Sequence, residues 1–538
     1  MKKTNKTRKI AAMIAAMALA ATMAVPSVMM SASAEDVAAV TITGLDASVA
    51  RTFEVYQVFT GKYDTDKGSF SELKWGSGVT SYDETTVTAG ELVADSVLEN
   101  LGNDARAIVG DLELGTATKT VKSSAATLKI DGLADGYYVI KDVTNMDDKD
   151  DANSAWIVQV AADGKTTNIA IKKETPSVDK QVLDETADAE AGATDGWGES
   201  ADHAINETFQ FKLIATIPAN DNYAAYDTYQ LKFNDTMSSG VTYEDIKSVT
   251  ITSSTLTGTK ALELTASQYT ETATAATSKA GLTWSLSIAD VKALVNADDA
   301  DIFGKEEITV EVIYNAHLNE NAIISTASGN DLNVNNNKVD LQYSNNPDNT
   351  GTGTSLGKTP EDFVWVFTYE VDNTKYKISA DSGNELAGAG FTLYSDSAKQ
   401  TEIKLIDNGD GTYTVADQTA TTGVVTEMTS HTGDGIFNIK GLDAGTYYLS
   451  ETSVPDGYNA ADDITITIGA THIENNAKNA ANLTLSGTNV DNDIVDTKNS
   501  TLPSTGGMGT TLFVIGGGVT AAAAGIYLVS KKRAKDAE

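Results

Sequence analysis

The chain has 538 residues, of which 39 are basic and 75 acidic, so its formal net charge at pH 7 is −36. This length predicts three or four domains, because single hydrophobic cores stop growing beyond about 250–300 residues. The negative charge argues against nucleic acid and anionic membrane surfaces as partners, since their phosphates would repel the chain. Hydrophobic residues make up 41% of the sequence, which supports folded domains.

The first 34 residues have the parts of a secretion signal. Basic residues at 2–9 precede an apolar run over 10–25, and the small residues at 32–34 suit a cleavage site. We therefore expect an exported protein whose mature chain begins at Glu35. Exported domains are often reinforced by disulfides, yet the chain contains no cysteine. Any covalent reinforcement must use other chemistry.

The sequence after the signal alternates Thr, Val, Ile and Tyr with polar residues and breaks at Gly, Asn and Asp turns. This pattern predicts a mainly β chain built from tandem antiparallel, immunoglobulin-like β-sandwich domains. Shifts in composition set the boundaries between them. The predicted segments are a signal peptide (1–34), an N-terminal domain (35–173), a middle domain (174–349), a linker (350–358), a C-terminal domain (359–498) and a terminal segment (499–538).

The terminal segment begins with a short motif and continues with an apolar run over 510–529 and a basic tail. At 1.5 Å per residue, that run is long enough to cross a hydrocarbon core of about 30 Å. The basic tail would hold the C-terminus on the cytoplasmic side. The residues of the motif are Leu502, Pro503, Ser504, Thr505 and Gly506.

These three parts resemble the cell-wall sorting signal of Gram-positive surface proteins, which a sortase transpeptidase cuts between the Thr and the Gly. The resemblance implies cleavage between Thr505 and Gly506, with Thr505 held as a thioester on the sortase cysteine until an amine releases it. It also implies an extracellular protein that is anchored to peptidoglycan in the cell wall.

The segment 168–182 is similar to the pilin-motif region of sortase-assembled shaft pilins, in which a lysine precedes the first strand of the second domain. The resemblance implies that Lys173 is the linking amine, with Lys172 as the alternative, although the usual Tyr-Pro-Lys-Asn is absent. The other interpretation is that both are solvated surface lysines. A linking lysine would join copies of this chain into a covalent homopolymer.

The segment 447–459 resembles the E-box of pilins and of collagen-adhesin (Cna) B-type domains. In that family, a glutamate promotes an amide bond between a lysine of the first strand and an Asn or Asp of the last. Strand alternation puts Lys375 on the apolar face of 363–375, and Asp496 is in phase with the apolar positions of the last strand. We therefore predict an isopeptide bond between Lys375 and Asp496, promoted by Glu451.

The middle domain repeats this arrangement. The segment 231–243 resembles a stretch of the pilin second domain and nominates Asp235 as the carboxyl promoter. Lys180 shares a face with its neighbouring valines, and Asn345 is in phase with the apolar positions before it. The prediction is a bond between Lys180 and Asn345, with Asn346 as another acceptor and a non-covalent Lys–Asp ion pair as the alternative.

The sequence offers little support for enzymatic chemistry. Its four histidines are scattered, without an HExxH motif or a triad-like grouping, and the acidic loops lack complete EF-hand spacing. We expect no metal, no cofactor and no activity toward other substrates. Together, the resemblances imply the major shaft subunit of a pilus. Its expected partners are sortase, peptidoglycan and further copies of the chain, with ancillary pilins and host receptors as additional candidates. The alternative is a monomeric wall-anchored adhesin with the same domains.

Overall fold

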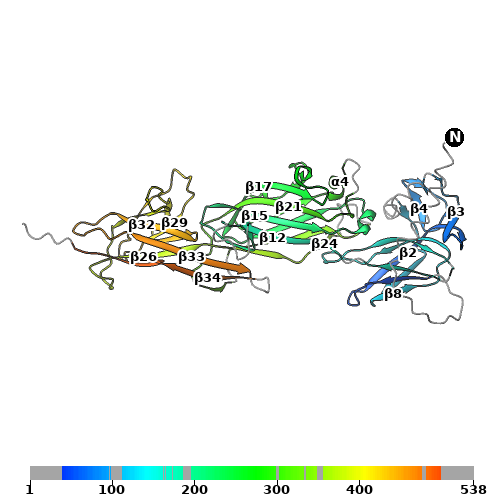
Figure 1. Ribbon diagram of the computed structural model, residues 1–538, viewed down its shortest axis with the longest axis horizontal. Helices are drawn as coiled ribbons and strands as arrows, with labels where there is room; N and C mark the ends of the chain where they lie inside the picture. The colour runs from blue at the N-terminus through cyan, green and yellow to red at the C-terminus, as the bar shows by residue number, and fades with distance from the viewer. Residues whose placement is uncertain are drawn as a thin grey trace, which may run out of the picture. The chain divides into compact units, whose positions relative to one another are not determined.

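Strands dominate the computed structural model of the chain (Figure 1). The expected mainly β fold is confirmed, and the only α-helix bounded among the described residues is α4 (Val291–Val295). No helix among these residues is both long and apolar enough to cross a membrane. The structure describes residues 39–95, 97–98, 112–161, 163, 165–171, 174–185, 195–297, 302–326, 328–331, 335–347, 356–474 and 480–498.

The chain divides into two compact units. The first consists of residues 1–369, 441–444 and 469–486, and the second of residues 370–440, 445–468 and 487–538. The first unit thus contains the sheets of both the predicted N-terminal and middle domains. The predicted domain boundaries stay predictions.

Three sheets form the N-terminal part of the first unit. Their strand orders are β11-β1-β8, β10-β9-β2-β3 with β7 beside β2, and β5-β4-β6. Apolar side chains of β2, β9 and β10 point to both faces of their sheet, because successive residues of a strand face opposite sides, and they belong to two buried clusters. The strands are β1 (Ala39–Thr43), β2 (Arg51–Asp64), β3 (Ser69–Trp75), β4 (Val79–Tyr82), β5 (Thr85–Thr86), β6 (Leu112–Leu114), β7 (Lys119–Ser123), β8 (Thr127–Ile130), β9 (Gly136–Asp142), β10 (Ala155–Val160) and β11 (Thr166–Ala170).

Two larger sheets make up the middle part, in the orders β13-β12-β15-β21-β17-β18 and β14-β25-β23-β16-β20-β19. β24 also pairs with β23, and β22 pairs with the start of β34. The strands are β12 (Ser177–Leu183), β13 (Trp197–Gly198), β14 (Ser200–Asp202), β15 (Thr208–Ile217), β16 (Leu231–Met237), β17 (Val241–Thr252), β18 (Leu262–Glu263), β19 (Thr270–Glu271), β20 (Thr283–Ile288), β21 (Ile308–Leu318), β22 (Gly329–Asp331), β23 (Asn335–Ser344), β24 (Leu356–Lys358) and β25 (Asp362–Phe367).

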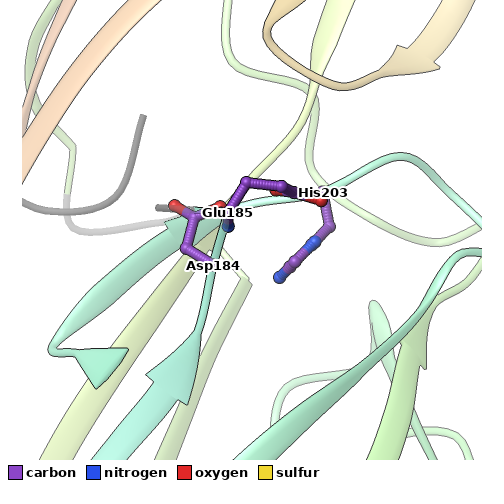
Figure 2. Close-up of side chains that lie close together, drawn as sticks. All are labelled: Asp184, Glu185 and His203. Atoms are coloured by element: carbon purple, nitrogen blue, oxygen red, sulfur yellow. Dashed lines mark hydrogen bonds between the residues drawn. The ribbon is translucent and has the colours of Figure 1, made fainter. Parts of the chain in front are cut away.

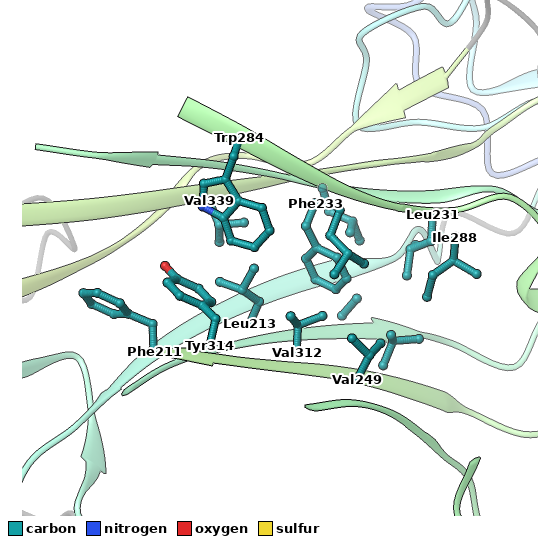
Figure 3. Packing of buried hydrophobic residues seen from close by; sticks show 14 of the residues in the cluster. Phe211, Leu213, Leu231, Phe233, Val249, Trp284, Ile288, Val312, Tyr314 and Val339 are labelled. Carbon is teal, nitrogen blue, oxygen red and sulfur yellow. The ribbon is translucent and has the colours of Figure 1, made fainter. Parts of the chain in front are cut away.

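The core of this middle part lies between the two sheets. β21 alternates between buried and half-buried residues, and β15 does so after its exposed first residue, so each presents one apolar face. Figure 3 shows Leu213 and Val312 from one sheet facing Phe233 and Val339 from the other. Each fully buried aliphatic or aromatic side chain of this kind contributes about 1.5–3 kcal/mol to folding, so the two sheets form a rigid frame for polar groups placed between them.

The second unit contains a sheet in the order β28-β29-β31-β26-β35 and the strands β33, β32, β27 and β30 of another sheet. β26 and β35, its first and last strands, pair in parallel, with Lys375 opposite Ile494. The strands of the predicted C-terminal domain are β26 (Tyr369–Lys377), β27 (Gly390–Tyr394), β28 (Leu405–Asp407), β29 (Thr412–Val415), β30 (Glu427–Thr429), β31 (Asn438–Leu442), β32 (Gly445–Ser453), β33 (Ile464–Glu474), β34 (Ala481–Thr488) and β35 (Asp491–Asp496). Of these, most of β34 and the part of β33 from Gly469 onward belong to the first unit.

Candidate functional site

Lys375, Glu451 and Asp496 meet in the interior of the second unit, where the sequence predicts a cross-link. Their side chains come from β26, β32 and β35 and are 0% exposed. The Lys375 Nζ lies 3.1 Å from the Glu451 Oε2 and also contacts the Asp496 Oδ1. The same Nζ lies 5.2 Å from the centre of the Phe391 ring, so the amine is enclosed by carboxyl groups and an aromatic face.

The environment of Glu451 favours its protonated form. Burial raises the pKa of Glu451, and the nearby Asp496 adds to this, while hydrogen bonds from Ala461 and Lys375 oppose it. The Ala461 N donates to the Oε2 at 2.6 Å. The other carboxyl oxygens, Glu451 Oε1 and Asp496 Oδ2, have no hydrogen-bond partner among the described residues. A proton held on Glu451 could therefore be donated to Asp496.

A second buried lysine lies between the two sheets of the middle part. The Lys180 Nζ, from β12, contacts the Asp235 carboxylate on β16 and donates to the Tyr314 hydroxyl on β21 at 3.1 Å. Burial lowers the pKa of Lys180 and raises the pKa of Asp235, although their mutual attraction opposes both shifts. Both groups are thus driven toward the neutral forms that amide formation needs.

The buried amide next to this lysine belongs to Asn337, a residue that the sequence reasoning missed. The Asn337 Nδ2 donates to the Tyr314 Oη at 2.6 Å, so Asn337 and Lys180 both bond to one hydroxyl oxygen. Tyr314 in turn donates to the Asp235 Oδ2 at 3.1 Å. The side chain of Asn337 is 0% exposed, and its Oδ1 lacks a hydrogen-bond partner among the described residues.

The structure does not bring the predicted acceptor, Asn345, to Lys180. Asp235 pairs with Val339, and Asn345 lies six positions further along the chain, which is about 20 Å in an extended strand. Its Nδ2 instead donates to the main-chain oxygens of Met146, at 2.7 Å, and Asp151, at 3.3 Å. Asn346, the other acceptor considered, is one position further away.

The N-terminal part has a buried arginine instead of a lysine. Arg51, at the start of β2, is 1% exposed and donates to the carboxylates of Asp142 and Asp151. Burial lowers the pKa of Arg51, but the two aspartates outweigh this effect and raise it. A guanidinium stays protonated in proteins and cannot attack a carbonyl, so this contact is an ion pair without the chemistry of the two lysine sites.

Several predicted sites lie outside the described residues. These are the signal peptide (1–34), the two candidate linking lysines, Lys172 and Lys173, and the motif from Leu502 to Gly506 with the apolar run after it. Their assignment rests on sequence.

Comparisons with known families test the terminal segment directly. Residues 494–537 match the LPXTG cell wall anchor motif. Residues 372–481 match SpaA, a prealbumin-like fold domain. The chain is a cell-wall-anchored surface protein. The predicted surface location and the resemblance of its C-terminal domain to those of pilins are confirmed, and the anchor implies processing by a sortase.

The chain is similar to a streptococcal surface protein and to solved structures of pilins. It is 24% identical to the trypsin-resistant surface T6 protein of Streptococcus pyogenes serotype M6, over 87% of this chain and 79% of that protein. The T6 backbone pilin structure from the same organism covers 87% of this chain and 100% of its own, with a TM-score of 0.46 and 17% identity. The major pilin SpaD of Corynebacterium diphtheriae covers 86% and 98%, with a TM-score of 0.40 and 15% identity.

Proposed function

We propose that this chain is the major structural subunit of a covalently polymerised pilus on the cell surface. The observation that carries the proposal is the pair of buried lysine–carboxyl sites, Lys375 with Asp496 and Lys180 with Asp235, in a wall-anchored chain without cysteine. A non-catalytic role as a polymer subunit fits sites enclosed within the core, since an external substrate could not reach them.

Polymerisation would use the sorting signal of one copy and a lysine of another. Sortase cleaves between Thr505 and Gly506, and its cysteine holds the Thr505 carbonyl as a thioester. The amine of Lys173, or of Lys172, attacks that carbonyl and displaces the thiolate, which leaves an amide between two subunits. The last subunit is transferred to a peptidoglycan amine in the same way.

Within the second unit, the neutral Lys375 amine attacks the Asp496 carboxyl carbon. The new C–N bond replaces a C–O bond, and the departing oxygen leaves as water with one proton from the amine and one from Glu451. Because the fold holds the amine against the carboxyl group, no external catalyst is needed: such intramolecular placement corresponds to effective concentrations of about 10⁵–10⁸ M.

The corresponding reaction in the first unit joins Lys180 to Asn337 and expels ammonia, with Asp235 as the promoter. Asn337 replaces Asn345 in this proposal because its amide shares the Tyr314 hydroxyl with Lys180. The Tyr314 hydroxyl accepts from the Asn337 Nδ2 and donates to Asp235, so it connects the leaving nitrogen to the promoter, and burial raises the pKa of Tyr314, which keeps its proton in place.

The test is the size distribution of the protein extracted from walls of a host that expresses it with a pilus sortase. We expect a ladder that survives boiling in detergent. Lys173→Arg should collapse the ladder to one band while Lys172→Arg, its control, leaves it intact. A ladder lost only with Lys172→Arg would move the linking role to that residue. A single band from the unaltered chain would instead favour the monomeric adhesin.

A further inference from the structure

Two aspartates and a histidine meet in the first unit, away from both lysine sites. Asp184 follows β12, Asp202 ends β14 and His472 lies on β33. The His472 Nε2 lies 3.3 Å from the Asp184 Oδ2 and 3.5 Å from the Asp202 Oδ1. Of the groups of potential metal ligands among the described residues, this is the only one whose three members are all buried.

The polar atoms of this cluster lack the partners that burial normally requires. Asp202 is 0% exposed, and its carboxylate oxygens have no well-formed hydrogen bond among the described residues, although the imidazole nitrogen and the Tyr369 hydroxyl both approach them. The His472 Nε2 likewise makes no well-formed hydrogen bond there. Buried polar atoms are paired in most proteins, so the Asp202 Oδ1 and the His472 Nε2, which lie 3.5 Å apart without a well-formed hydrogen bond, indicate a missing positive ligand.

A contact of the second ring nitrogen, Nδ1, sets the orientation of the His472 imidazole. The His472 Nδ1 lies 2.9 Å from the Ser200 Oγ. When the Nδ1 donates to this hydroxyl, the neutral ring directs the Nε2 lone pair between the two carboxylates. A hydrogen bond to the second ring nitrogen is the usual support for a metal-ligating histidine.

The spacing of the three atoms suits one kind of ion. Zinc binds nitrogen and carboxylate oxygen at about 2.0–2.2 Å, and a tetrahedron of such bonds has edges of about 3.3–3.5 Å. The two measured separations, 3.3 and 3.5 Å, agree with these edges. Calcium, which takes six to eight oxygen ligands, fits a site with an imidazole poorly.

We propose that Asp184, Asp202 and His472 form a binding site for a divalent transition-metal ion, with Zn²⁺ as the best-fitting ion. Three protein ligands leave the fourth position of the tetrahedron to water. The two carboxylates balance the charge of the ion, and its bonds would tie the end of β12 to β14 and β33. The site therefore adds a non-covalent cross-link to the proposed covalent ones.

A neighbouring arrangement is the natural competitor. Asp184 also groups with Glu185 and His203, as Figure 2 shows. Glu185 is exposed, however, and the His203 Nε2 lies 2.7 Å from the main-chain oxygen of Leu183, which leaves only the Nδ1 of His203 for an ion. The second competitor is a proton on His472, which would give an ion pair with both carboxylates and no metal.

Titration of the chelator-stripped full chain with ZnCl₂, followed by calorimetry, distinguishes these cases. We expect one zinc ion per chain and a rise in melting temperature on loading. His472→Gln and Asp202→Asn should each weaken binding at least about 100-fold, and Ser200→Ala about 10-fold. His431→Gln, which alters a histidine paired with Asp434 in the second unit, is the matched control and should bind as the unaltered chain does.

Absence of zinc binding by the unaltered chain overturns the proposal in favour of the ion pair. Loss of binding with His203→Gln but not with His472→Gln overturns it in favour of the neighbouring group. If the variants do not fold, the anomalous zinc signal in crystals of the zinc-loaded unaltered chain decides the matter. An ion between Asp184, Asp202 and His472 supports the site, and an ion at any other position contradicts it.

Discussion

The Nζ of Lys375 and the Asp496 carboxylate are in contact inside the second unit, although 121 positions separate them in the sequence. They belong to the first and last strands of one sheet, which run parallel. A bond between them would therefore close nearly the whole C-terminal domain into one covalent loop.

Lys375→Arg should abolish this closure, because a guanidinium is too weakly nucleophilic to form the amide. By intact-mass analysis, the folded chain should lack about 18 Da for the water expelled at this site, and the variant should regain that mass. Closing so long a loop is worth about 5 kcal/mol, so the variant should also unfold at lower denaturant concentration. Lys377→Arg, two positions along β26, is the control and should keep the deficit. An unchanged mass in Lys375→Arg would rule out the cross-link.

Asn337→Ala and Asn345→Ala separate the two acceptors considered for Lys180. We expect Asn337→Ala to remove a deficit of about 17 Da, the mass of ammonia, while Asn345→Ala retains it. Mass spectrometry of peptides spanning β12 and β23 locates the linked residues. The reverse pattern would restore Asn345 as the acceptor and place it beside Lys180 despite the register of β23.

Arg51→Met tests the role of the ion pair in the N-terminal part. The substitution leaves the buried Asp142 carboxylate without its guanidinium, which typically costs about 3–5 kcal/mol. We expect faster proteolysis within β2 and β9, measured by limited digestion, while the lysine sites keep their mass deficits. Lys62→Met, which breaks an exposed pair with Glu72, should digest at the normal rate. Equal effects of both substitutions would show that Arg51 is not a structural anchor.

Glu306 should make the first unit sensitive to acid. Hydrogen bonds from Thr255, Ser254 and Ser253 lower the pKa of Glu306 from 4.5 to about 2. Because the folded pKa is depressed, this contribution to stability is present above about pH 4.5 and is lost as the pH falls toward 2. The melting temperature measured across this range should fall less steeply in Glu306→Gln than in the unaltered chain. Parallel curves would exclude this residue as the cause.

The predicted inward position of Lys375 is confirmed, but the single continuous strand on which the prediction rests is not present. The prediction assumes one strand over 363–375, but the structure divides this segment at Thr368 into β25 and β26, which belong to different sheets. Lys375 still faces inward because β26 alternates from its own first residue, with Tyr369 and Val371 buried. Glu451 was identified by its motif, which needs no knowledge of the sheet.

The same alternation could not choose the acceptor for Lys180. Asn335 and Asn337 on β23, and Asn345 just after its end, are all separated from Val339 by an even number of positions, so each is in phase with it. Only the register against β16, which pairs Met237 with Asn337, separates them. The proposed metal site could not be predicted for another reason: His472 and Ser200, which orients its ring, lie 272 positions apart, and no local spacing connects them.

The parallel pairing of β26 with β35 also governs how a fibre built from such subunits would respond to pulling. Tension that enters at the start of β26 and leaves at the end of β35 would shear these strands along each other. With Lys375 bonded to Asp496, the force would pass directly from one strand to the other through amide chemistry. The residues between these two strands would carry no load. Their loops could therefore bind surfaces or change during evolution without weakening the fibre.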